Sequence, residues 1–175
     1  RPLTINWLDE NIAAILETWF LGTTAGNAIA DVLVGDYNPS GKLPMTFPRH
    51  VGQIPIHYNM KNTGRPFEAD NKYTSKYLDI SNDPLYPFGY GLSYTTFDYG
   101  AINLSSNLMT STDTIKVKIE VRNTGKFGGE EVVQLYLKDK VASVSRPVKE
   151  LKAFKKIYLD AGVSKSVTFF ITNGV

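Results

Sequence analysis

Hydrophobic and polar residues alternate with a period of two in the second half of the chain. The clearest stretch is 114–121, where four β-branched residues fill every second position: Ile115, Val117, Ile119 and Val121. Such alternation predicts a strand with one buried and one exposed face. Further extended stretches are expected at residues 131–138, 148–158 and 163–171. Short strands separated by turns at this spacing predict an antiparallel β-sandwich.

In the first half of the chain, hydrophobic residues recur with the period of an α-helix instead. Four apolar residues fall on one face of a predicted helix at residues 24–34: Ala28, Ile29, Val32 and Leu33. Thr23 or Thr24 can cap the start of this helix, and Gly35 is placed to end it.

The flanking segments complete a pattern of α/β type. Residues 6–11 predict a short helix, with Asn6 as its cap and Asp9 as the partner in a capping box. Residues 13–20 are apolar with little alternation, which predicts a buried strand. The turn Asn38-Pro39-Ser40-Gly41 then leads into another predicted strand at residues 43–47.

Three parts are therefore expected along the chain. Residues 1–60 form the end of an α/β domain, residues 61–95 form a linker, and residues 96–175 form the β-sandwich. The linker is dense in Gly, Pro, Asn, Asp and Tyr, so we expect a long ordered connection.

Composition narrows the classes of function. With 175 residues, 42% of them hydrophobic, the chain can bury a core. Its 19 basic and 17 acidic residues are interspersed and give a net charge of +2, so nucleic acid and anionic membranes are not expected as partners. Neither a signal peptide nor an apolar run long enough to cross a bilayer is visible. A homo-oligomer stays possible.

Candidate chemistry within the chain is sparse. There is no cysteine, and the two histidines, His50 and His57, lack a carboxylate partner at ligand spacing. We therefore expect no metal and no cofactor. A phosphate-binding loop is excluded because Gly35 and Gly41 enclose five residues instead of four, and Leu43 stands where Ser or Thr would hold magnesium.

Five segments, in order, resemble glycoside hydrolase family 3, as found in bacterial periplasmic β-glucosidases. They are AILETWF (14–20), GNAIADVLVGDYNPSGKLPMTFP (26–48), NTGRP (62–66), KYTSKYLD (72–79) and LYPFGYGLSYTTF (85–97). The resemblance implies the end of the family's α/β sandwich domain, followed by a fibronectin type III-like domain that lacks its terminal strands. Both ends of the sequence are expected to be cut. The first 50 residues have no initiator methionine and too few strands for an α/β layer, and Asn173-Gly174 predicts a hairpin turn without a returning strand.

The resemblance also implies where catalysis takes place. Family 3 β-glucosidases retain anomeric configuration, which requires two carboxyl groups roughly 5 Å apart. The nucleophile is an Asp on an N-terminal barrel and the acid/base is a Glu upstream of the point that matches Arg1, so no catalytic residue is expected in this chain. The β-glucoside substrate would be bound through the missing catalytic domains.

Some residues within the chain are alternative candidates for catalysis or sugar binding. Glu17, near the carboxyl end of the predicted strand, is the best local catalytic candidate, and Asp79 and Asp83 are the second. Structural or solvated carboxylates are the more ordinary explanation of all three. An aromatic set could stack on sugar rings but is better explained as packing: Tyr73, Tyr77, Tyr86, Phe88 and Tyr90.

The resemblance thus implies the supporting C-terminal part of an exo-acting, retaining β-glucosidase that is periplasmic or secreted. The alternative is a non-catalytic module whose β-sandwich binds carbohydrate or protein. The five ordered segments before the sandwich favour the enzyme, because a binding module has no need of them.

Overall fold

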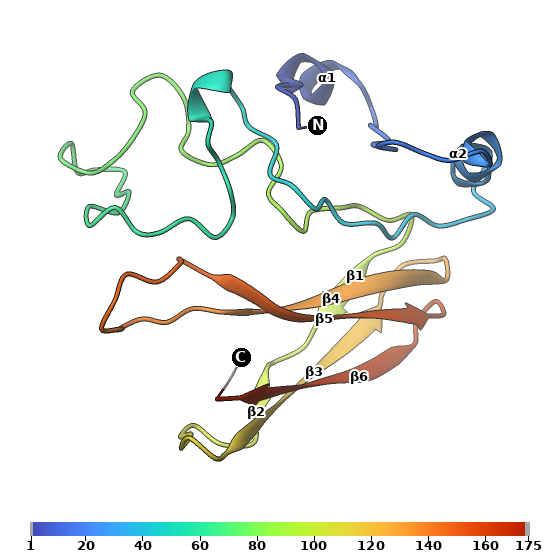
Figure 1. The fold of residues 1–175 in the computed structure, drawn as a ribbon. Helices are drawn as coiled ribbons and strands as arrows, with labels where there is room; N and C mark the ends of the chain where they lie inside the picture. The colour runs from blue at the N-terminus through green and yellow to red at the C-terminus, as the bar shows by residue number, and fades with distance from the viewer. Residues whose placement is uncertain (1, 174–175) are drawn as a thin grey trace. The chain divides into compact units, whose positions relative to one another are not determined.

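The computed structural model describes residues 2–173, which divide into two compact units (Figure 1). Unit 1 contains the residues up to Gly26 together with Lys42–Tyr90 and Leu137–Glu150. Unit 2 contains Asn27–Gly41, Gly91–Tyr136 and the residues from Leu151 onward. The chain therefore passes between the units several times.

Unit 2 is a β-sandwich. One antiparallel sheet contains four strands: β1 (Phe97–Tyr99), β2 (Asn103–Leu104), β3 (Thr114–Asn123) and β6 (Ser164–Thr172). The second sheet contains β4 (Gly129–Leu137) and β5 (Glu150–Leu159). Strand β3 is central, because β6 pairs with nearly its whole length while β1 and β2 pair with separate parts of it. These strands confirm the predicted extended stretches and the sandwich.

The core of unit 2 is formed by the facing sides of its two sheets. Its buried residues come from four strands: Val117, Val121, Val133, Ile157, Leu159, Val167 and Phe169. On β3 the predicted period of two is observed, since Val117 and Val121 are buried while the lysines between the apolar positions are exposed. Burial of each such side chain contributes about 1.5–3 kcal/mol, so this shared face accounts for the association of the sheets.

Asn123 is a fully buried polar residue at the end of β3, with 0% of its surface exposed. Its Nδ2 donates to the carbonyl oxygens of Phe127 (2.8 Å) and Leu159 (3.0 Å). Its Oδ1 accepts from Thr95 Oγ1 (2.6 Å) and from the backbone N of Gly125 (3.1 Å). One amide thereby joins three loop positions to β5. These hydrogen bonds compensate the free-energy cost of removing the amide from water.

Helix α1 (Asn6–Asn11) lies where the sequence predicts it, but the predicted cap is wrong. The N-cap residue is Ile5, and no side chain caps the helix. Asn6 lies inside the first turn, so its side chain is not in the N-cap position that a capping box requires.

The predicted buried strand at residues 13–20 is also wrong. Within residues 2–173 this segment has no strand partner, and Phe20 is 97% exposed. The Glu17 carboxylate accepts a hydrogen bond from the backbone N of Trp19, whose φ of 52° bends the chain. Strand structure needs a neighbouring strand to pair the backbone groups, and a hydrophobic pattern cannot supply one.

Helix α2 (Ala25–Val34) confirms the predicted helix. It ends before Gly35, whose φ of +88° is the left-handed conformation that favours glycine after a helix. None of its residues is buried.

Unit 1 is built around a ribbon in which residues 43–47 run antiparallel to residues 85–90. The backbone N of Leu43 donates to Tyr90 O, and the backbone N of Phe47 donates to Tyr86 O, each at 2.8 Å. Only the bridge between Phe47 and Tyr86 has ladder geometry, so the predicted strand at 43–47 is an extended ribbon instead. The short 3₁₀ helix η1 (Val51–Gln53) follows.

The α/β-type segments precede an all-β sandwich, which confirms the predicted fold class. The turn predicted at Asn173-Gly174 extends beyond the residues that the structure describes.

Candidate functional site

Two of the three carboxylates that the sequence singled out, Glu17 and Asp83, make local structural contacts. The carboxylate of Glu17 is exposed and bonds to the backbone of Trp19 at 2.8 Å. Asp83 is exposed and accepts from Ser81 Oγ at 3.4 Å, while Asp79 is exposed on the preceding loop. These contacts favour the structural explanation of Glu17 and Asp83, and exposure of Asp79 agrees with a solvated loop carboxylate.

Both histidines lie in unit 1. His50 caps η1, since its Nδ1 accepts a hydrogen bond from the backbone N of Gly52 at 3.0 Å, and the side chain of Gln53 completes a capping box. His57 is exposed. Within residues 2–173, no group of three or more His, Cys, Asp or Glu side chains is arranged to hold a metal ion.

The aromatic set divides into packed and exposed members. Tyr86 stacks on Tyr90 with ring centroids 5.1 Å apart, and Phe88 stacks on Tyr58 at 4.2 Å. Tyr73 and Tyr77 are exposed instead. Tyr86, Phe88 and Tyr90 therefore pack against other rings of unit 1, as the packing explanation expects.

Tyr86 also forms a side-chain pair that the sequence did not predict. Its hydroxyl donates a short hydrogen bond to the carboxylate of Asp9 in α1. Burial, followed by this bond and the charge of Asp9, raises the pKa of Tyr86 to about 12. The two residues are 77 positions apart, so no local pattern could have indicated the contact. The pair fastens α1 to the ribbon of unit 1.

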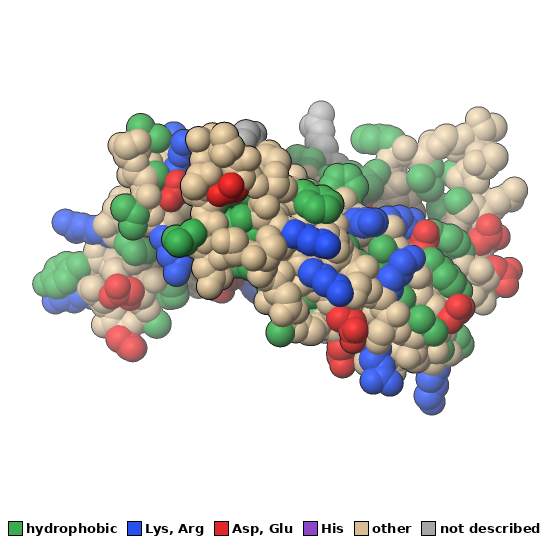
Figure 2. All heavy atoms as spheres, turned by 90° about the horizontal axis from the view of Figure 1, so that it is seen from below, with side chains coloured by type: hydrophobic (Ala, Val, Ile, Leu, Met, Phe, Trp, Pro, Cys, Tyr) green, Lys and Arg blue, Asp and Glu red, His purple; other side chains and the backbone are tan. Residues whose placement is uncertain are grey.

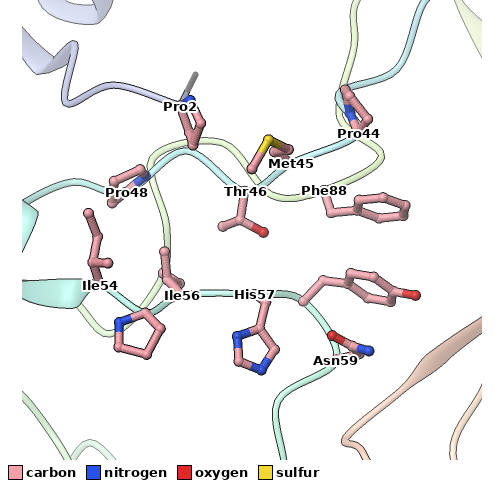
Figure 3. Close-up of a pocket in the computed structure, with 12 residues that line it drawn as sticks. Pro2, Pro44, Met45, Thr46, Pro48, Ile54, Ile56, His57, Asn59 and Phe88 are labelled. Carbon is pink, nitrogen blue, oxygen red and sulfur yellow. The ribbon is translucent and has the colours of Figure 1, made fainter.

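Unit 1 contains an apolar pocket of about 400 Å³ (Figure 3). Its wall is formed by proline and other apolar side chains, with Thr46, His57 and Asn59 as the polar members. The Phe88 ring lies at one side of it and stacks on Tyr58, which also lines the pocket. The lining includes no carboxylate, so the pocket cannot provide the acid or the nucleophile of a glycosidase.

A cluster of polar contacts lies in unit 2, around Glu130 at the start of β4. Its carboxylate pairs with Lys156 Nζ of β5 at 2.6 Å and accepts from Tyr37 Oη at 2.6 Å and from Ser40 Oγ at 3.3 Å. The bond from Lys156, followed by that from Tyr37, lowers the pKa of Glu130, and the Glu130 carboxylate in turn raises the pKa of Lys156. The sequence analysis placed Ser40 in a turn and did not single out Tyr37, and the partner of both residues lies about ninety residues later.

Asn38 extends this cluster. Its Nδ2 donates to Gly128 O at 3.0 Å, and its Oδ1 accepts from Ser93 Oγ at 2.8 Å and from the backbone N of Tyr94 at 2.9 Å. A Cβ on Gly129 would lie 2.5 Å from Asn38 Nδ2, so glycine is required for this approach. The cluster binds one segment of the chain to another and has no feature of a catalytic centre.

Charge on the surface is mixed. On the face in Figure 2, lysine and arginine side chains lie near aspartate and glutamate. Among the helices of residues 2–173, none has both the length and the apolar character to cross a membrane.

Comparison with known protein families shows to which family the chain belongs. The model of the glycosyl hydrolase family 3 C-terminal domain matches residues 1–94, which is more than half of the sequence. The chain belongs to glycosyl hydrolase family 3. A fibronectin type III-like domain model matches residues 131–174, in agreement with the sandwich of unit 2. Both assignments confirm the resemblance found in the sequence.

Individual relatives cover nearly the whole chain. It is 59% identical to a periplasmic β-glucosidase of Salmonella typhimurium and 50% identical to a β-xylosidase of Formosa agariphila, in each case over 97% of its length. The crystal structure of a β-glucosidase from Listeria innocua in complex with isofagomine matches 99% of the chain with a TM-score of 0.93 and 49% identity. The chain spans only 22%, 23% and 24% of these three relatives, respectively.

Proposed function

We propose that this chain is the C-terminal supporting part of a retaining, exo-acting β-glucosidase that hydrolyses terminal β-D-glucosyl residues. The observation that carries the proposal is the match to β-glucosidases along nearly the whole chain, at 59% and 49% identity. Its share of less than a quarter of each relative's length agrees with a part of the enzyme.

The supporting role is inferred from the arrangement of the carboxyl groups in the described chain. Retaining hydrolysis requires two carboxyl groups that face one pocket about 5 Å apart. Glu17 and Asp83 make local contacts, and the apolar pocket of unit 1 has no carboxylate in its lining. In our proposal the nucleophile and the acid/base precede Arg1, and the chain itself contributes neither a catalytic residue nor a cofactor or metal site.

Domain organisation and location are part of the same proposal. Residues 1–60 end the α/β domain, 61–95 connect, and 96–175 form the fibronectin-like domain. The enzyme is periplasmic or secreted, as the name of the Salmonella relative indicates for that protein. Because one relative is a β-xylosidase, a β-xyloside is the alternative substrate to be tested.

The test is an activity assay on the isolated chain and on the complete polypeptide that contains it, with aryl β-glucoside and aryl β-xyloside as substrates. The proposal expects hydrolysis of the glucoside by the complete polypeptide only. Release of aglycone by the repurified chain, abolished by Glu17→Gln, would contradict the supporting role. A complete polypeptide that prefers the xyloside would contradict the assigned substrate.

A further inference from the structure

Helix α2 lacks the packing that normally stabilises a helix of its length. It has ten residues, none of them buried, and its apolar Leu33 remains 69% exposed. Isolated helices shorter than about 12–15 residues are marginal in water, because few hydrogen bonds compensate the cost of nucleation. Within residues 2–173, Ile29 and Val32 are only half-buried, so polar contacts contribute much of what holds α2 in place.

Two sets of polar contacts connect α2 to the sandwich. The first is a hydrogen bond from Tyr94 Oη to the carbonyl oxygen of Val32, inside the last turn of the helix, at 2.7 Å. The second is the segment directly after the helix, where Tyr37, Asn38 and Ser40 bond to the start of β4 and to residues 93–94.

The surface of the sandwich that contacts residues 37–40 combines two glycines with a charged pair, Glu130 and Lys156. Gly129 leaves room for the Asn38 amide, and Gly128 offers its carbonyl oxygen. The side chain of Glu130 is 31% exposed and has Lys156 on one side and the Tyr37 hydroxyl on the other. Charge-assisted bonds of this kind are about twice as strong as neutral ones.

We propose that the fibronectin-like domain acts as an intrachain docking module. Its surface at Gly128, Glu130 and Lys156 holds the turn 37–40 and thereby keeps α2 folded. The inference rests on the supporting role proposed above, and it assigns that role to a defined surface. The family model's C-terminal domain covers residues 1–94, yet residues 27–41 cluster with the sandwich, which agrees with docking between the two modules.

Amide hydrogen exchange of the full chain tests the docking directly. Glu130→Ala changes the sandwich side only, about ninety residues from the helix, and removes the acceptor for Tyr37, Ser40 and Lys156. We expect the amides of α2 to exchange about tenfold faster or more, while those of β3 and β6 keep their rates.

Tyr99→Phe is the matched control. It removes another tyrosine–glutamate bond, from Tyr99 Oη to Glu131 Oε1 at 2.7 Å, at the neighbouring position of β4. Exchange in α2 should not change in this variant. If Glu130→Ala unfolds the sandwich, Tyr37→Phe, which removes only a hydroxyl from the turn, replaces it.

Unchanged exchange in α2 in the folded variant would overturn the docking role, and so would an equal rise in Tyr99→Phe. This measurement does not involve activity. A failure here therefore leaves the glycosidase proposal standing, and failure of the activity assay leaves the docking intact.

Discussion

Replacement of Asn123 by aspartate should strongly destabilise the sandwich, although the two side chains have nearly the same shape. The variant Asn123→Asp loses the two hydrogen bonds that Nδ2 donates to Phe127 O and Leu159 O. Each such bond contributes about 1–1.5 kcal/mol, and a carboxylate would face two carbonyl oxygens at a site with 0% exposure. We therefore expect a loss of at least about 4 kcal/mol at neutral pH, out of roughly 5–15 kcal/mol for a typical domain.

The pH dependence gives this prediction a second signature. Burial disfavours the charged form, so the folded-state pKa of the introduced carboxyl lies above its unfolded value of about 3.9. The variant then loses stability as the pH rises, and its deficit relative to wild type should be smaller at pH 4 than at pH 8.

Thermal unfolding followed by circular dichroism at both pH values is the assay. A deficit of this size lowers the midpoint by roughly 15 °C or more in a domain of this length. Asn103→Asp is the control, because Asn103 is an exposed asparagine on β2 whose Nδ2 donates only to Ala101 O in its neighbourhood. Equal midpoints for wild type and Asn123→Asp, or a deficit that does not depend on pH, would refute the reasoning.

Three further predictions, two of them with a matched control variant, test other parts of the fold. Val117→Asp should cost several kcal/mol because it buries a charge in the core, whereas Lys116→Asp on the exposed face should change little; equal melting shifts would contradict the register of β3. Gly125→Ala should destabilise by about 1–3 kcal/mol, since its Cβ would lie 2.2 Å from Thr95 Oγ1, while Gly22→Ala has open space and should be neutral in urea unfolding. Because the pKa of Tyr86 is raised from 10.0 to about 12, the folded state retains that proton longer and stability falls between these pH values; Tyr86→Phe should reduce this fall, and an unchanged fall would refute the shift.

The sequence predicted the sandwich better than the first unit for a physical reason. The strand β3 has its partners and its core within the chain, so the alternation of Val117 and Val121 with lysines is expressed in the fold. The apolar segment 13–20 carries an equally hydrophobic pattern, but no neighbouring strand pairs with its backbone.

Contacts between distant residues were not predictable from local patterns. The bonds of Tyr86 to Asp9 and of Tyr37 to Glu130 depend on how the chain folds back, and neither residue type stands out at its position. The hydrophobic pattern did not single out Asn123, whose burial in the fold is accompanied by four hydrogen bonds.

A chimeric enzyme tests the central claim, that this chain supports catalysis by residues outside it. The chain would replace the matching segment of the β-glucosidase from Listeria innocua, to which it is 49% identical with a TM-score of 0.93. We predict that the folded chimera hydrolyses an aryl β-glucoside, that the Listeria enzyme without this segment does not, and that the chain alone does not. A folded but inactive chimera, or hydrolysis by the chain alone, would contradict the account.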